Sequence, residues 1–366
     1  MFVIFIGLVI LSLLFPKSKK IAFLSLIFIF VTFTFVYYEG DLQVYKWIYY
    51  DYGGGLSSST FEPGFTLLMI IFKFLGLPFT AFRAGLAFLY AVLLYWGIKR
   101  YTDYLALALT FSIIFPFGTM VVAMRTAIAC VILLNGYHYL YDSQQKKGII
   151  KYLIVVSIAS LFHYSSLLFL LFLFSRMKFN NKRIFKIILC TVIFSLILNQ
   201  TNLIYIVVSH ITTRAKTLQW LSPGEGTANF KGAVIIILLL LMNYFLACRC
   251  RLNLLSPRKK QKKCRNKQVA NFCYKSSIIL FFFYPLMILN SPFMRIFYIM
   301  VPIFICNVMN VCFSKGKMEL CNPPITSQGI LLLFMLMILR VYYDFPYMDE
   351  HYMLFQEFIR WSSVVF

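Results

Sequence analysis

The chain has 366 residues, of which 61% are hydrophobic, 19% are aromatic and only 13% are charged, and its formal net charge is +23. With a mean hydropathy of +0.81, this composition excludes a soluble globular domain, in which about 45–50% of residues are apolar. The charge does not indicate a nucleic-acid-binding face either. The densest basic stretch, CRCRLNLLSPRKKQKKCRNK at residues 248–267, has no aromatic residue among its basic ones.

Apolar runs recur along the whole sequence, and many approach the roughly 17 to 25 residues of a membrane-spanning helix. We therefore predict an all-α, polytopic integral membrane protein of one domain, residues 1–366, with about 11–13 transmembrane or re-entrant helices. The first run has no charged leader and no cleavage site, so we expect a retained helix rather than a signal peptide. The clearer spans are Phe2–Phe15, Ile21–Tyr38, Thr80–Ile98, Tyr104–Val122, Thr126–Tyr141, Ile149–Phe174, Ile184–Leu198, Gly232–Ala247, Ser276–Leu289, Ile296–Phe313 and Ile325–Tyr343.

The densest basic runs and the main acidic clusters lie in different polar breaks between these spans. Lys and Arg gather at residues 17–20, 176–186 and 248–267, and the positive-inside rule places such breaks in the cytoplasm. The acidic breaks then lie on the other side. We therefore predict outer loops at 39–62 and 201–231 and a basic cytoplasmic loop at 249–270. We expect the cysteines to be reduced, because they lie in spans or cytoplasmic loops.

The number of crossings between residues 62 and 175 has two solutions. If every run crosses once, four basic residues fall outside, against the charge rule: Lys99, Arg100, Lys146 and Lys147. If Pro63–Gly76 instead dips in and returns, and the run around His163 folds into a hairpin, all four fall inside. The second count places Arg125 and His163 near the outer surface, and we favour it because it satisfies more of the charge bias.

Two polar stretches lie in the outer loop after the second span. In YYEGDLQVYKWIYYDY, residues 37–52, Asp41 and Tyr45 are one helical turn apart and would share a helix face. The aromatic density is more typical of an interfacial belt than of sugar stacking. In FEPGF, Glu62 precedes a proline suited to the first helical position. We expect this carboxylate to be a helix cap unless a partner is found.

Arg125 and His163 are polar side chains in apolar surroundings. Arg125, in MRTAIAC, costs about 2.5–3.5 kcal/mol inside a span, so it either snorkels to the interface or faces a cavity. His163, in SIASLFHYSSLLFLLFLF, is either a catalytic group or a structural one. Together with Arg295 they would form a cationic cleft suited to a lipid diphosphate. The outer segments have no Asp-x-Asp pair, so we expect neither metal nor cofactor.

In this order, these stretches resemble the EpsG family of polysaccharide polymerases, which is related to the Wzy-type O-antigen and capsule polymerases. The resemblance runs from the second span to the late arginine. The stretches that carry it are DLQVY (Asp41–Tyr45), EPGF (Glu62–Phe65), RTAIA (Arg125–Ala129), ASLFHYSSL (Ala159–Leu167) and RIFY (Arg295–Tyr298).

The resemblance implies an enzyme of the bacterial plasma membrane that transfers a glycan from an undecaprenyl diphosphate carrier to another lipid-linked repeat unit, without metal or nucleotide. The implied roles are proton transfer by His163, Asp41 or Glu62, diphosphate binding by Arg125 and Arg295, and sugar binding by Tyr45 and Tyr298. Its partners would be the lipid-linked substrate, the bilayer, and a flippase and chain-length regulator of the same pathway. A flippase of lipid-linked sugars and a glycan ligase remain alternatives.

Overall fold

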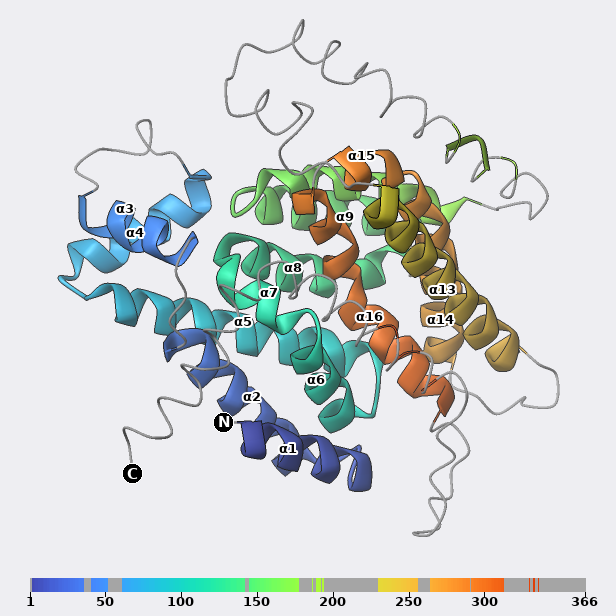
Figure 1. Cartoon of the computed structure of the whole chain (residues 1–366), viewed down its shortest axis with the longest axis horizontal. Helices are drawn as coiled ribbons and strands as arrows, with labels where there is room; N and C mark the ends of the chain where they lie inside the picture. The colour runs from blue at the N-terminus through green and yellow to red at the C-terminus, as the bar shows by residue number, and fades with distance from the viewer. Residues whose placement is uncertain are drawn as a thin grey trace, which may run out of the picture. The chain divides into compact units, whose positions relative to one another are not determined.

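The computed structural model describes residues 2–35, 41–51, 61–141, 145–177, 230–255, 264–289 and 291–312, with a few isolated positions between 186 and 193 and between 329 and 335. Every regular element in these ranges is a helix (Figure 1). Helices satisfy their own backbone groups, which an apolar environment requires. Their bounds are α1 Phe2–Leu14, α2 Lys19–Phe35, α3 Asp41–Asp51, α4 Pro63–Phe74, α5 Phe79–Tyr101, α6 Leu105–Ile114, α7 Phe117–Val122, α8 Met124–Gly136, η2 Tyr137–Leu140, α9 Gln145–Ser160, η3 Tyr164–Arg176, α13 Phe230–Leu255, α14 Cys264–Phe281, α15 Tyr284–Leu289, η5 Ser291–Met294 and α16 Arg295–Cys312.

Three of these helices are long and apolar enough to cross a membrane: Phe79–Tyr101, Gly232–Leu254 and Arg295–Cys312. Shorter apolar helices accompany them at Val3–Leu14, Pro63–Phe74, Leu105–Ile114 and Tyr164–Arg176. The prediction of an all-α membrane protein is confirmed. The expected spans Ile184–Leu198 and Ile325–Tyr343 and the loop at 201–231 lie almost entirely outside the described residues, so the number of crossings remains a prediction.

The chain forms two compact units. The first comprises Met1–Leu170 with Ile299–Phe366, and the second comprises Leu171–Tyr298. In the second, α13 and α14 pack side by side, with the Tyr244 and Tyr274 rings 5.8 Å apart. The Tyr284 hydroxyl of α15 donates to the Ala233 carbonyl of α13 at 3.2 Å. The prediction of a single domain is not tested by this division.

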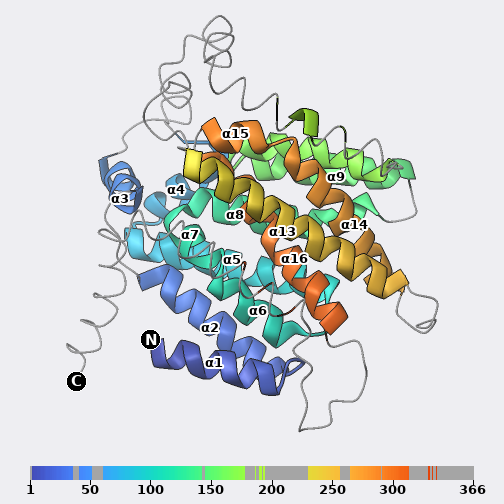
Figure 2. The same ribbon diagram turned by 45° about the vertical axis from the view of Figure 1, so that its right-hand side comes forward.

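The first unit is built on α2, α5, α6 and α8, with α1 alongside α2 and α6 in Figures 1 and 2. Buried polar groups connect its helices. The Ser25 hydroxyl of α2 lies 3.1 Å from the Thr110 hydroxyl of α6. Gly136 lets α8 approach α9 closely, because a Cβ there would lie 2.5 Å from Val155 Cγ1. Small residues and hydrogen bonds of this kind hold membrane helices together.

The expected span Tyr104–Val122 is not one helix. It consists of α6 and α7, which are separated at Phe115 and Pro116. A proline has no backbone N–H and its ring clashes with the preceding turn, so Pro116 interrupts the helix. The prediction of one continuous span is wrong for that reason.

The run around His163 folds into a hairpin, as the favoured count expected. The helix α9 ends at Ser160 and η3 begins at Tyr164. The Tyr152 hydroxyl donates to the Phe169 carbonyl at 2.9 Å. In a straight helix these residues would be about 25 Å apart, so the chain reverses between them. The arms have 16 and 13 residues, about 24 Å as α-helix and about 26 Å as 3₁₀-helix, close to the thickness of a bilayer core.

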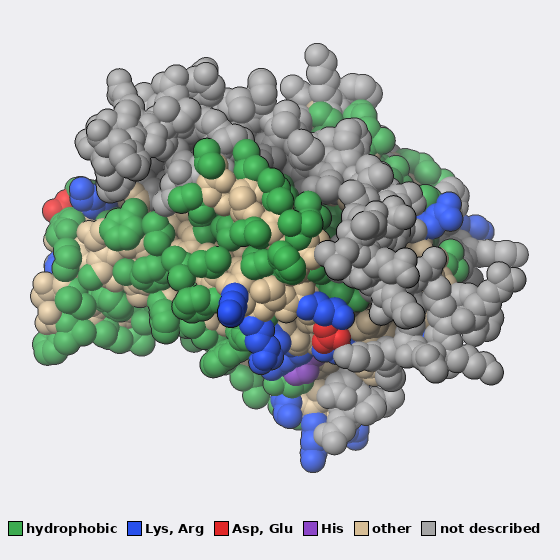
Figure 3. Space-filling view, turned by 90° about the horizontal axis from the view of Figure 1, so that it is seen from below, with side chains coloured by type: hydrophobic (Ala, Val, Ile, Leu, Met, Phe, Trp, Pro, Cys, Tyr) green, Lys and Arg blue, Asp and Glu red, His purple; other side chains and the backbone are tan. Residues whose placement is uncertain are grey.

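The helices of the first unit have one basic end. At the far end of α2 from Lys19, the Phe33 carbonyl accepts a 2.6 Å bond from Arg83 near the start of α5, so these two helices are antiparallel. At the end of α5, Arg100 donates to the Asn135 carbonyl near the end of α8 at 2.8 Å. Figure 3 shows a group of Lys and Arg side chains on one part of the surface, with an acidic and a histidine side chain among them. Exposed basic residues at this end include Lys17, Lys19, Lys20, Lys99, Arg100, Lys146 and Lys147, and Asp103 is exposed between α5 and α6.

The opposite end carries Glu62, Asp41 and Asp51, and we call it the acidic end. The chain enters α4 at Glu62 and leaves it to start α5 at Phe79, whose N–H donates to the Tyr50 hydroxyl of α3 at 3.2 Å. Both starts lie at the acidic end, so α4 does not carry the chain across. This path agrees with the favoured count of crossings, in which Lys99, Arg100, Lys146 and Lys147 lie on one side of the membrane.

Candidate functional site

Glu62 is the centre of a polar cluster at the acidic end of the first unit. One of its carboxylate oxygens, Oε2, lies 2.5 Å from Arg125 Nη1. The other, Oε1, lies 3.2 Å from His163 Nδ1 and accepts a 3.3 Å bond from the Tyr164 N–H. Only 6% of the Glu62 side chain is exposed. The expectation that Glu62 is a helix cap is wrong, because its side chain makes no capping bond to α4 and has two side-chain partners instead.

The segment Glu62–Gly64 docks the start of α4 against the tip of the hairpin. Pro63 occupies the first turn, where its missing N–H costs nothing. The Gly64 N–H donates to the Leu161 carbonyl at 2.8 Å. A Cβ on Gly64 would lie 2.9 Å from both the Leu161 Cβ and its carbonyl oxygen. Only glycine permits this approach, which brings Glu62 to His163.

Arg125 lies in the first turn of α8 and is held by aromatic side chains as well as by Glu62. Its Nε donates to the Tyr45 hydroxyl at 3.2 Å, and its guanidinium lies 4.7 Å from the centroid of Phe61. Tyr45 is 4% exposed, with its ring 5.2 Å from Phe61 and 5.5 Å from Phe65. This burial favours a role for Tyr45 in holding Arg125 over stacking against a sugar.

The charges of the cluster keep Glu62 ionised. Burial by itself raises the pKa of the Glu62 carboxyl, but the hydrogen bond with His163 and the charge of Arg125 outweigh it and lower the pKa to about 2. A carboxylate with so low a pKa is a weak base near neutral pH. Arg125 and His163, two of the three residues expected to form a cationic cleft, therefore lie against an anion.

His163 lies at the turn of the hairpin and is oriented by Glu62. With its Nδ1–H donated to the carboxylate, the neutral imidazole carries its lone pair on Nε2. A carboxylate that fixes the tautomer in this way also stabilises the imidazolium that forms on protonation. The pair is therefore suited to accepting a proton from a hydroxyl group.

The other three predicted site residues are Asp41, Arg295 and Tyr298. Asp41, the first residue of α3, is exposed. Arg295 is half-buried at the start of α16, and Tyr298 is 3% exposed in the same helix. Both belong to the second unit.

Phe61 and Gly64 were not singled out from the sequence. Both lie in the FEPGF stretch beside Glu62, and this proximity is the sequence signal that could have identified them. Within the described ranges, no group of three or more His, Cys, Asp or Glu side chains has an arrangement that could hold a metal ion.

Comparison with known proteins gives one family match. The model of the EpsG family matches residues 19–356, which include every residue of the cluster. No curated protein and no solved structure matches the chain.

Proposed function

This chain belongs to the EpsG family, and on that premise we propose that it joins undecaprenyl-diphosphate-linked oligosaccharide repeat units into a surface polysaccharide. Membership suggests a polymerase related to exopolysaccharide synthesis. The observation that carries the proposal is the Glu62 carboxylate bound by both His163 and Arg125 at one end of a helical bundle. That arrangement unites an oriented base with a guanidinium group.

In the proposed reaction, a hydroxyl of the acceptor repeat attacks the anomeric carbon of the donor. A glycosidic bond forms, the bond between that carbon and the diphosphate oxygen breaks, and the carrier leaves as its diphosphate. His163 Nε2 takes the hydroxyl proton, while Glu62 holds the ring and stabilises the resulting charge. Glu62 is not the base in this scheme, because its low pKa makes it a weak one.

Arg125 is the proposed partner of the leaving diphosphate. Two of its five N–H donors are used within the described residues, by Tyr45 and Glu62. The remaining donors suit phosphate oxygens, and charge stabilisation of this kind is usually the largest contribution to catalysis. Arg295 is proposed as a second diphosphate ligand from the family resemblance, whereas Tyr298 is as buried as Tyr45, at 3% exposed, and is not proposed as a sugar contact.

The acidic end is proposed to face outward. The basic end carries Lys17, Lys19 and Lys20 together with the ends of α5 and α8, and the positive-inside rule places it in the cytoplasm. Glu62, Arg125 and His163 then lie at the outer face of the bacterial plasma membrane, where the lipid-linked repeats would be joined.

The test is chain extension by the purified protein on a synthetic lipid-linked repeat, with no other protein present. We expect wild type to give a ladder of products, and His163→Ala and His163→Gln to give none while remaining folded. The matched control is His138→Gln, because His138 contacts Arg100 at the basic end. An imidazole base also gives activity that rises with pH as the ring loses its proton.

Two results would overturn the proposal. Full turnover by His163→Gln with a flat pH profile would remove His163 as the base. Transport of the lipid-linked repeat across vesicles by wild type, with no extension under any condition, would identify a flippase instead.

A further inference from the structure

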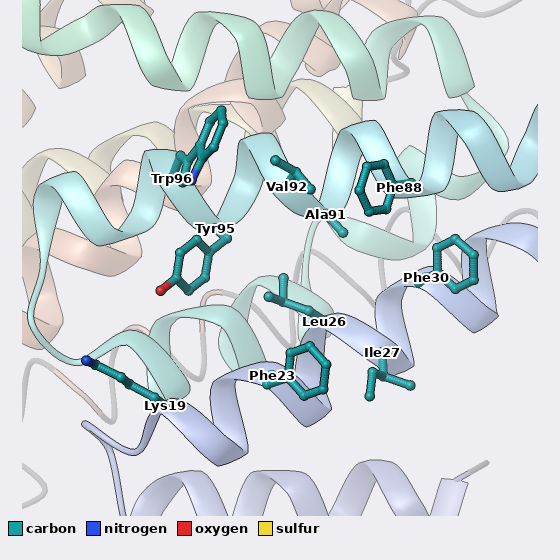
Figure 4. Close-up of a pocket in the computed structure, with 10 residues that line it drawn as sticks. All are labelled: Lys19, Phe23, Leu26, Ile27, Phe30, Phe88, Ala91, Val92, Tyr95 and Trp96. Carbon is teal, nitrogen blue, oxygen red and sulfur yellow. The ribbon is translucent and has the colours of Figure 1, made fainter.

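A groove lies between α2 and α5 on the first unit, away from the Glu62 cluster. Its volume is about 540 Å³, within the range of about 300–1,000 Å³ that is usual for ligand sites. Figure 4 shows its walls, which α2 supplies from Lys19 to Phe30 and α5 from Phe88 to Trp96. Ala91 forms part of the α5 wall and leaves space between the larger side chains.

The polar groups of the groove are all at one end. The Lys19 amine and the Tyr95 hydroxyl lie near each other there in Figure 4, whereas the Trp96 side chain extends from α5 away from Lys19. Lys99 adds a second positive charge, with its Nζ 5.5 Å from the centroid of the Tyr95 ring. The rest of the lining is apolar and ends at Phe30 and Phe88. A ligand that fits has an anionic head and a long apolar tail.

The groove has the length of one membrane leaflet. From Lys19 to Phe30 the α2 wall rises through eleven residues, about 16 Å. Half of a hydrocarbon core is about 15 Å. Lys19 and Trp96 would therefore lie at the interface, where Lys, Tyr and Trp side chains collect, and Phe30 and Phe88 near the bilayer centre.

We propose that this groove binds one acyl chain of an anionic phospholipid from the leaflet at the basic end, with its headgroup phosphate held by Lys19. Tyr95 has an O–H donor for the same phosphate or its ester oxygens. The first turn of α2 also favours an anion, because Lys19 is its first residue and the helix dipole is positive there.

The polyprenyl carrier is the rival occupant, and the charge distribution argues against it. The carrier's diphosphate would be used at Glu62 and Arg125, at the acidic end. The cationic end of the groove is the opposite one, where Lys19 and Lys99 lie. A carrier seated in the groove would have its diphosphate at the wrong end of the helices.

The test uses fluorescence of Trp96, which is 56% exposed and lines the groove. The full chain with its three other tryptophans, Trp47, Trp220 and Trp361, changed to Phe is placed in phosphatidylcholine vesicles. A minor fraction of the lipid is dibrominated in its acyl chains, as either phosphatidylglycerol or phosphatidylcholine. Bromine quenches an indole that it contacts.

We expect phosphatidylglycerol to quench Trp96 at about one fifth of the mole fraction that phosphatidylcholine needs, the enrichment that one lysine at a membrane surface gives. Lys19→Ala should abolish this preference, and its control Lys20→Ala should keep it. Val92→Phe, which fills the groove, should weaken quenching by both lipids. Its control, Leu24→Phe, is exposed on α2 outside the groove and should not.

Each of the other outcomes overturns the proposal. Equal quenching by the two lipids, or a preference that survives Lys19→Ala, removes the headgroup site. No quenching by either lipid means that protein covers the groove. Loss of the phosphatidylglycerol signal on addition of equimolar polyprenyl phosphate assigns the groove to the carrier. The readout does not involve turnover, so it stands even if the chain is not a polymerase.

Discussion

Gly64→Ala should damage the enzyme without removing any functional group. Gly64 is the contact point between the start of α4 and the tip of the hairpin, where its N–H donates to the Leu161 carbonyl at 2.8 Å. An added Cβ would lie 2.9 Å from that carbonyl oxygen and from the Leu161 Cβ, and ordinary contact begins at 3.4 Å. The neighbouring atoms are backbone and Cβ, so no side-chain rotation relieves the overlap.

The size of the effect follows from these distances. Leu161 must retreat by about 0.5 Å to move from 2.9 Å to the 3.4 Å of ordinary contact. The same shift stretches the 3.2 Å contact between Glu62 and His163 beyond hydrogen-bond length. Overpacking costs typically about 1–3 kcal/mol of folding stability. Misplacing a catalytic group by about 1 Å costs on the order of 10²-fold in rate, so we expect roughly a tenfold loss here.

The assay is the initial rate of chain extension by purified protein, with thermal unfolding measured on the same sample. The matched control is Gly118→Ala in α7, where an added Cβ meets nothing within 4 Å. A Gly64→Ala protein with the rate and unfolding temperature of Gly118→Ala would refute the claim that this contact sets the position of His163.

The remaining predictions concern the charges. Arg125→Ala should lower extension by about 10²- to 10³-fold, Arg125→Lys should restore little because an ammonium lacks the planar fork, and near-normal product ladders from Arg125→Ala would refute its role. Because the folded pKa of Glu62 is about 2 against an ordinary 4.5, its ionisation stabilises the fold above about pH 4.5 and loses that effect as the pH falls toward 2. The unfolding temperature of wild type should therefore fall more steeply over this range than that of Glu62→Gln, and parallel curves would contradict the ion pair. In a cysteine-free background, Lys260→Cys should resist a membrane-impermeant thiol reagent in spheroplasts, and labelling would reverse the topology.

Local patterns in the sequence predicted much of the first unit. The lengths of the apolar runs predicted the bounds of α2 and α5 to within a few residues. The positive-inside rule favoured a hairpin at His163, and the structure shows one. The broken span Tyr104–Val122 had a visible cause, since Pro116 lies within it. In such stretches the secondary structure follows from the lengths of the apolar runs and from the effect of proline on the backbone.

The Glu62 cluster depended on information that local patterns lack. Glu62 is 63 residues from Arg125 and 101 from His163, so nothing nearby in the sequence identified its partners. A carboxylate before a proline is commonly a helix cap, and that reading was wrong because tertiary contacts took over its oxygens. Tyr45 shows the same limit: the aromatic density of its stretch suggested an interfacial belt, whereas its ring is buried against Phe61 and Phe65.

The hairpin of α9 and η3 has a consequence for how the protein is made. Its tip, Leu161–His163, contains no Lys, Arg, Asp or Glu, so the two arms can enter the bilayer as a pair without carrying a fixed charge across it. Lys146 and Lys147 remain on the side from which insertion starts. Glu62 and Arg125 are synthesised before the tip, and the imidazole reaches them only when both arms are fully seated. The bond between Glu62 and His163 therefore requires the hairpin to be in place.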